Sequence, residues 1–306
     1  MTAQQLAIHA DYQISLHRAR APDDAVPLVI TFGGQPSGLG ETGFGTGWCL
    51  QLGWDTIYVA QRHGTQYQGL SMEDFRDAVA AICAGRDVVC YGSSLGGYAA
   101  LYYAGAIGAR VLAASPMLPA WPPLGRRPDM IPILHRPLAD VPRSPHSPIL
   151  LYDPMVAADR RIIDEMIAPV YPDARHAELP FAGHTTLQTL NSAGILKDFV
   201  RAAIAEDRVL PLDFDRDRDP IYHFQKGRHL VACDPEAARR HFETSLTLAP
   251  SRHVAANLLG VLLRLDDRVA AQALVDRYHG DPDHPLPAPA LRRAEMSGLA
   301  IPDPFR

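Results

Sequence analysis

Residues 87–101 read DVVCYGSSLGGYAAL, and this stretch decides the fold class. Its apolar run at 88–91 predicts a buried strand, which leads directly into a turn rich in glycine. A second apolar run predicts a helix over residues 98–107. Between them, Ser94 has one glycine two residues before it and another two residues after it, the Gly-x-Ser-x-Gly pattern of a nucleophile elbow. The strand, the helix and both glycines agree, so Ser94 is a candidate nucleophile rather than only a helix cap.

Strand-like and helix-like segments alternate on both sides of this stretch. Short apolar runs predict further strands at residues 28–32, 55–60, 110–114, 149–152 and 176–179. Apolar residues at helical spacing predict helices at residues 71–82, where Ser71 would be the N-cap, and at residues 160–170 and 186–204. This alternation predicts an α/β fold, a mostly parallel sheet with helices on both faces, over residues 1–207.

A proline-rich segment interrupts the alternation, with nine prolines in the 31 residues 118–148. Proline fixes φ and lacks an N–H donor, which excludes a long helix or a central strand here. We expect a short, stiff and irregular segment over one end of the sheet. Trp121, Arg126 and Arg127 from this segment are candidates for the mouth of a pocket. A segment this short would leave a cleft at that end of the sheet open.

The composition excludes several classes of protein. A formal net charge of −5 without a basic stripe argues against a nucleic-acid binder. No apolar run reaches the length of about 18 residues that a membrane span needs, and the first five residues do not resemble a signal peptide. The four cysteines show no CxxC spacing, which indicates free thiols in a reducing cytoplasm.

The C-terminal part, residues 208–306, has a different character. Residues 213–219, DFDRDRD, predict a solvated linker; the alternative, a calcium loop, lacks the glycine and terminal glutamate of that pattern. Helices are predicted at residues 237–250, 254–265 and 269–278. Ala238, Phe242, Leu246 and the closing Ala249-Pro250 resemble one tetratricopeptide-type hairpin. Because a single repeat cannot bury its own apolar face, we expect it to dock on the sheet domain or on another subunit.

Residues 1–207 resemble the α/β-hydrolase family, most clearly in YGSSLGGYAAL at 91–101 and VLAASP at 111–116. The family order is serine, then acid, then histidine. His184, in LPFAGHTTL, follows a predicted strand, precedes a predicted helix and matches the family's histidine loop. The resemblance implies that a neutral His184 accepts the proton of Ser94 and later returns it.

Two aspartates are candidates for the acid that orients His184. Asp153 closes the strand ILLY, and Asp159 follows six residues later in VAADRR. We favour Asp153 because the fold usually presents its acid near a strand end, and because Asp159 would also suit the N-cap of the helix at Arg160. The opposite assignment stays open, since the family's aspartate often lies a few residues beyond the strand.

The strand at 28–32 ends in Gly33-Gly34-Gln35, where the family forms its oxyanion hole. The resemblance implies backbone N–H donors from Leu95 and from Gly34 or Gln35, and glycine permits the close approach that they require. The glycine-rich run that continues to Gly47 lacks the Gly-Lys-Ser/Thr ending of a phosphate loop. His63 follows another strand and is a candidate for substrate contact.

The leading prediction is a serine hydrolase that cleaves a small-molecule or glycan-linked acyl ester or thioester without a metal or organic cofactor. The first alternative is a non-catalytic scaffold in which the C-terminal helices bind a protein partner or a second copy of the chain. The second is acyl transfer to an acceptor other than water, which would use the same residues.

Overall fold

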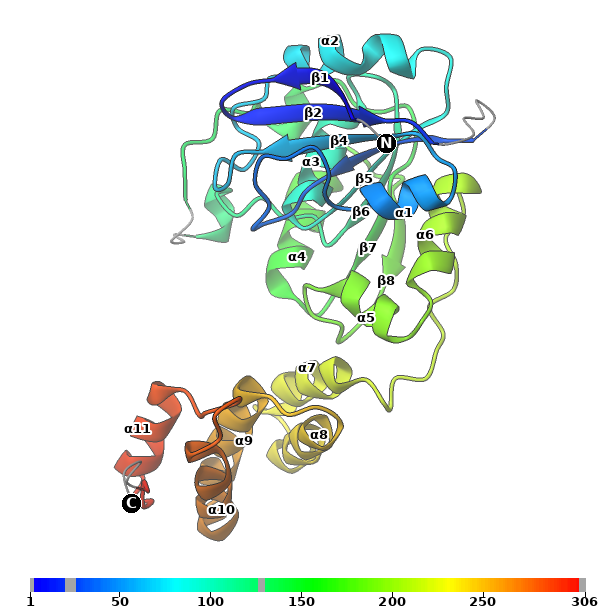
Figure 1. Cartoon of the computed structure of the whole chain (residues 1–306). Coiled ribbons are helices and arrows are strands. Elements are labelled where there is room, and N and C mark those ends of the chain that lie inside the picture. Colours follow the sequence, from blue (N-terminus) through cyan, green and yellow to red (C-terminus); the bar gives the residue numbers. More distant parts are fainter. Residues whose placement is uncertain (1–2, 20–25, 126–129, 303–306) are drawn as a thin grey trace. The chain divides into compact units, whose positions relative to one another are not determined.

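Eight strands form one sheet in the order β1-β2-β4-β3-β5-β6-β7-β8 (Figure 1). The computed structural model describes residues 3–19, 26–125 and 130–302. The strands are β1 (Gln4–Ile8), β2 (Tyr12–His17), β3 (Leu28–Phe32), β4 (Thr56–Gln61), β5 (Val88–Ser93), β6 (Arg110–Ala114), β7 (Ile149–Tyr152) and β8 (Arg175–Glu178). From β4 to β8 every neighbouring pair is parallel, and only the β1–β2 and β2–β4 pairs are antiparallel.

The helices of this part flank the sheet on both faces (Figure 1). They are α1 (Thr46–Gln51), α2 (Met72–Cys83), α3 (Leu95–Ala104), α4 (Ala157–Ile162), α5 (Thr186–Ser192) and α6 (Leu196–Ala205), with a π-helical turn at Ile163–Ile167 after α4. The mostly parallel sheet between two helical layers and the additional C-terminal helices confirm the predicted fold class.

Several boundaries differ from the sequence prediction for local reasons. Helix α3 starts at Leu95 rather than at residue 98, because the turn at Ser94 passes directly into the helix. The single helix predicted over residues 186–204 is wrong: Gly194, with φ +75°, separates α5 from α6. The proline-rich segment contains only two short 3₁₀ turns among its described residues, at Pro122–Leu124 and Leu138–Asp140, in agreement with its composition.

Alternation along the strands gives each face of the sheet its own core. Leu28, Ile30 and Phe32 of β3 point to the face covered by α2 and α3, where Phe32 stacks on Tyr103 with 5.9 Å between ring centroids. Phe75 of α2 completes this cluster at 4.8 Å from the ring of Tyr103. Full burial of each such side chain stabilises the fold by about 1.5–3 kcal/mol, and the resulting rigidity fixes the strand ends that carry the site.

His135, from the proline-rich segment, is buried on the same face. Its ring stacks on Tyr102 at 4.1 Å, and its two nitrogens lie 2.9 Å from the Tyr98 hydroxyl and 3.2 Å from the Leu70 carbonyl oxygen. Burial lowers the pKa of His135 to about 4. The imidazole is therefore neutral near pH 7, which allows it to accept from Tyr98 and donate to Leu70.

The chain divides into two compact units. The first comprises Met1–Pro180 and His184–Leu212, and the second Phe181–Gly183 and Asp213–Arg306, so the boundary lies five residues beyond the predicted one at residue 207. Among the described residues, the second unit has helices α7 (Pro220–Leu230), α8 (Pro235–Leu248), α9 (Arg252–Arg264), α10 (Arg268–His279) and α11 (Ala288–Met296). Helices α7 and α11 were not predicted. The second unit contains its own core, which includes the buried Ala238, Phe242 and Leu246.

Among the described residues, none of the helices combines the length and the apolar character required to cross a membrane.

Candidate active site

The turn at Ser94 has the backbone geometry of a strained elbow. Strand β5 ends at Ser93, Ser94 has φ 54° and ψ −121°, and α3 begins at the next residue. A positive φ is costly for a residue with a side chain, so neighbouring structure has to hold it. The Ser94 N–H donates to the Ala114 carbonyl oxygen at 2.8 Å, and the Met117 N–H donates to the Ser94 carbonyl oxygen at 3.0 Å. The end of β6 therefore fixes the turn.

The flanking glycines are required by close backbone contacts. A Cβ at Gly92 would overlap the carbonyl group of Gly96, and a Cβ at Gly96 would overlap the carbonyl oxygen of Phe32 at the end of β3. Neither position has room for a side chain unless the backbone moves. These contacts bring the start of α3 against the end of β5 and present Ser94 at the carboxyl edge of the sheet.

His184 brings Ser94 and Asp159 into one hydrogen-bonded chain. It lies in the loop between β8 and α5, and its Nε2 is 2.8 Å from Ser94 Oγ. Its Nδ1 is 2.7 Å from Asp159 Oδ1. With a neutral imidazole, Nδ1–H donates to the carboxylate and Nε2 accepts from the serine hydroxyl. About a third of the His184 side chain is exposed (34%), whereas the Asp159 side chain is buried (0%), so the imidazole is in part open to solvent and the carboxylate is not.

The structure pairs His184 with Asp159 and not with Asp153, the aspartate favoured in the sequence analysis. The chain after β7 turns at once: Asp153 Oδ1 accepts from the Met155 N–H at 2.8 Å, a local turn that holds this carboxylate at the strand end. Helix α4 then begins at Ala157 with Val156 as its N-cap. Asp159 therefore lies inside the first turn of the helix and does not cap it, and that turn carries its carboxylate to the imidazole.

The second oxygen of Asp159 adds to the electrostatic role of this carboxylate. Oδ2 is buried, and among the described residues it has no hydrogen-bond partner. A buried carboxylate with one hydrogen bond retains a strong preference for a nearby cation. It therefore favours the imidazolium that His184 becomes when it accepts a proton.

A hydrogen bond between two hydroxyls anchors the helix that follows the histidine loop. Ser115, which follows β6, and Thr186, at the start of α5, are both buried, and their hydroxyl oxygens are 3.1 Å apart. This bond ties the helix that follows His184 to the strand next to β5. The sequence analysis did not identify either residue, because a hydroxyl pair 71 positions apart leaves no local pattern.

The three oxyanion-hole candidates differ in burial and in their position relative to Ser94. A side chain at Gly34 would meet the Ser93 carbonyl oxygen at 3.1 Å and Ser94 Cβ at 3.9 Å, so the Gly34 backbone lies beside the nucleophile. Leu95 is fully buried and is the first residue of α3. Gln35 is exposed. The donor role of all three residues stays a prediction.

The remaining sequence candidates have less direct positions. His63 is exposed, and its Nδ1 lies 3.2 Å from the Pro36 carbonyl oxygen, so it contacts the loop that contains Gly34 and Gln35. Its role in substrate binding stays a prediction. Trp121 lines a cavity of about 330 Å³ together with His135. Arg126 and Arg127 lie outside the described residues. Within the described ranges, no three His, Cys, Asp or Glu side chains are placed to hold a metal ion.

The comparisons with known proteins concern the fold. No protein-family model matches the sequence, and neither does any curated protein. An alpha-beta serine hydrolase homologue from Coxiella burnetii superposes with a TM-score of 0.42 at 12% identity, over 64% of this chain and 96% of the other. A lidless α/β serine hydrolase from Xanthomonas campestris gives a TM-score of 0.41 at 15% identity, over 66% and 94%. Est1E from Butyrivibrio proteoclasticus gives 0.41 at 12% identity, over 65% and 98%.

Proposed function

We propose that this protein is a serine hydrolase that cleaves a carboxylic ester or thioester through an acyl-enzyme on Ser94. The observation that carries the proposal is the continuous hydrogen-bonded chain from Ser94 Oγ through His184 to the buried Asp159. A serine hydroxyl is a weak nucleophile at neutral pH, and an adjacent imidazole oriented by a carboxylate is the arrangement that activates it.

In the first half of the reaction, Ser94 Oγ attacks the carbonyl carbon while His184 Nε2 accepts the hydroxyl proton. Asp159 stabilises the imidazolium through the hydrogen bond at Nδ1 and keeps Nε2 directed at the serine. The imidazolium then protonates the leaving alcohol or thiol, and the acyl group stays on Ser94. In the second half, His184 accepts a proton from water, the resulting hydroxide attacks the acyl-enzyme, and Ser94 receives its proton back.

The developing oxyanion needs donors that are in place before the reaction. We assign these to the N–H of Leu95, at the start of α3, and to the N–H of Gly34 or Gln35. The proximity of Gly34 to Ser94 supports this assignment, and so does the position of Leu95 directly after the nucleophile. Loss of one such donor typically lowers kcat by about 10²–10³.

Hydrolysis of a panel of p-nitrophenyl esters with increasing acyl length, together with an acyl thioester, tests the proposal. Wild-type protein should hydrolyse at least one member, with a preference for short or polar acyl groups, and Ser94→Ala should lose this activity. Ser93→Ala is the matched control, because it removes the neighbouring hydroxyl of the same Ser-Ser pair and should keep most of the activity. A folded wild type without activity on the panel, or equal rates for wild type and Ser94→Ala, would contradict the proposal.

Acyl transfer to an acceptor other than water would use the same three residues. Product analysis at low concentrations of added alcohols separates the two reactions, because a hydrolase then releases mainly the free acid whereas a transferase forms mainly the transfer product. The four cysteines are free, and three of them are buried, which supports a reducing compartment such as the cytoplasm.

A further inference from the structure

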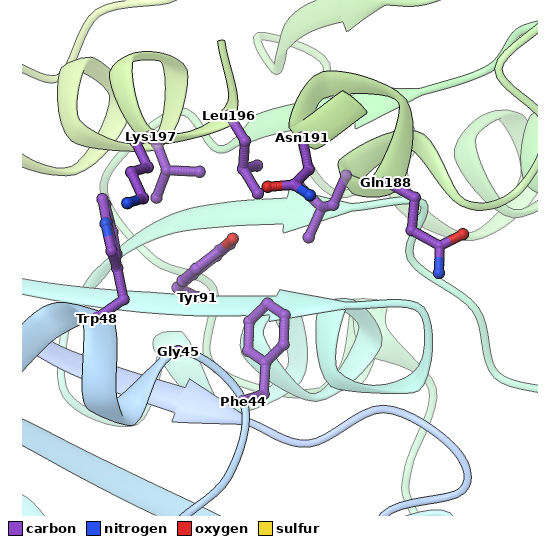
Figure 2. Close-up of a pocket in the computed structure, with 10 residues that line it drawn as sticks. Phe44, Gly45, Trp48, Tyr91, Gln188, Asn191, Leu196 and Lys197 are labelled. Atoms are coloured by element: carbon purple, nitrogen blue, oxygen red, sulfur yellow. The ribbon is translucent and has the colours of Figure 1, made fainter. Parts of the chain in front are cut away.

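A cavity of about 380 Å³ lies on the face of the sheet opposite α3, between α1, β5, α5 and α6 (Figure 2). Its size is within the range of about 300–1,000 Å³ that small-molecule sites occupy. Figure 2 shows Phe44, Trp48 and Tyr91 around one side of it and Leu196 with Asn191 on the other. The walls are thus largely aromatic and aliphatic, with a few polar groups at the α5 and α6 side.

The hydroxyl of Tyr91 is an unused polar group in this cavity. Tyr91 is buried, with 4% of its surface exposed, and its ring packs on Phe44 with 4.8 Å between centroids. In the part of the chain that the structure describes, no hydrogen bond joins this hydroxyl to another residue. Figure 2 shows the hydroxyl directed into the space below Leu196 and Asn191. The hydroxyl is therefore open to the cavity, where it is free to donate to a molecule bound there.

Lys197 supplies a positive charge at the edge of the same cavity. It is the second residue of α6, it is exposed, and Figure 2 shows its ammonium group near Trp48. None of the described carboxylates forms an ion pair with it. The sequence contains only one other lysine, Lys226, whose Nζ donates to the Tyr222 hydroxyl at 2.8 Å. The cavity thus combines an apolar interior, one neutral donor and one available cation.

We propose that this cavity binds a small monocarboxylate with an apolar body. The apolar part would lie between the rings of Phe44, Trp48 and Tyr91, where removal of its surface from water favours binding. The carboxylate would pair with Lys197, and the Tyr91 hydroxyl would donate to the ligand. A hydrogen bond in which one partner is charged is stronger than one between neutral groups, so we expect the carboxylate to be preferred over a neutral head group.

This site is separate from the proposed catalytic centre. Neither Ser94 nor His184 lines the cavity. Tyr91 lies three residues before Ser94 along β5, which corresponds to about 10 Å at the rise of a strand. The binding proposal does not depend on the proposed hydrolase activity, and its test measures binding alone.

The test uses the full chain and exploits its two lysines. Reductive methylation with ¹³C-formaldehyde labels Lys197, Lys226 and the N-terminal amine, and Lys197→Arg and Lys226→Arg assign the two lysine resonances. Octanoate is the probe and octanamide its neutral analogue. Octanoate should shift the Lys197 resonance in a saturable manner and leave the Lys226 resonance in place. Octanamide should bind at least about tenfold more weakly, the ratio that corresponds to about 1.4 kcal/mol.

Calorimetric titration of variants completes the experiment. Lys197→Met should bind octanoate at least about tenfold more weakly, whereas the matched control Lys226→Met should bind it as wild type does. Tyr91→Phe, which keeps the aromatic wall and removes only the hydroxyl, should also weaken binding. No shift at Lys197, equal shifts at both lysines, equal affinities for octanoate and octanamide, or unchanged binding by Lys197→Met would each overturn the proposal.

Discussion

Replacement of Asp159 and Asp153 by asparagine, one at a time, separates the two candidate acids. The asparagine side chain in Asp159→Asn is nearly the same size as aspartate but uncharged, so it could neither stabilise the imidazolium nor fix the tautomer with Nδ1–H. The bond that this change disrupts is the 2.7 Å contact between His184 Nδ1 and Asp159 Oδ1. An equivalent change in a serine triad lowers kcat by about 10⁴, which corresponds to about 5.4 kcal/mol of transition-state stabilisation.

Asp153→Asn should behave differently, because Asp153 Oδ1 accepts a hydrogen bond from the Met155 N–H and an amide oxygen can accept the same bond. We expect a loss of less than about tenfold in kcat. The assay is steady-state hydrolysis of the best ester from the panel, with circular dichroism and thermal unfolding to confirm that both variants are folded. A large loss in Asp153→Asn together with a mild one in Asp159→Asn would refute the assignment of Asp159.

Three further predictions concern stability and thiol chemistry. Burial lowers the folded-state pKa of His135 to about 4, so the unfolded state binds more protons between about pH 6.5 and 4. The free energy of unfolding should therefore fall by roughly 3 kcal/mol as the pH drops from 6.5 to 4. In urea titrations, His135→Phe should show a smaller fall over the same pH range. Gly92→Ala should destabilise the fold or prevent folding, because its Cβ would meet a backbone carbonyl group. Gly47→Ala in α1 is the control; it has open space around it and should be neutral or stabilising. Similar melting temperatures for the two variants would contradict the close packing described at the Ser94 turn. A thiol reagent should titrate one exposed thiol, Cys233, rapidly in folded protein, because burial raises the pKa of Cys49 to about 12 and shields it; rapid reaction of several thiols would contradict the described burial.

The strands of the parallel sheet could be predicted because burial on both faces leaves a continuous apolar run, as at residues 28–32. Strands β1 and β2 were missed. Strand β2 is largely buried, but its sequence YQISLH mixes polar with apolar residues and gives no continuous apolar run. Strand β1 is only partly buried along its length, so its sequence QQLAI carries no strong period. Helix α7 was missed because the charged run before it was interpreted as linker throughout. Asp219 caps this helix and Pro220 is its first residue, a start signal that the sequence did contain.

In the candidate site, a residue marked by a pattern of adjacent residues could be predicted, whereas a pairing that depends on the path of the folded chain could not. Ser94 could be identified because its glycines and the change from strand to helix are adjacent in sequence. His184 needed the additional order of residues along the chain. The choice between Asp153 and Asp159 depended on how the chain turns after β7, and six residues of sequence do not determine that path. Tyr91 and Lys197 line the same cavity although they are 106 positions apart in the sequence, which no local pattern indicates.

Intact-mass analysis after treatment with a fluorophosphonate tests the central claim most directly, because this reagent bonds to an activated serine. The account predicts one adduct per chain, mapped by peptide sequencing to Ser94, and no adduct in Ser94→Ala. Labelling should also fall strongly in His184→Ala. An unlabelled wild type that is folded, or an adduct on another residue with Ser94 unmodified, would contradict the claim that Ser94 and His184 act together as a nucleophile and its base.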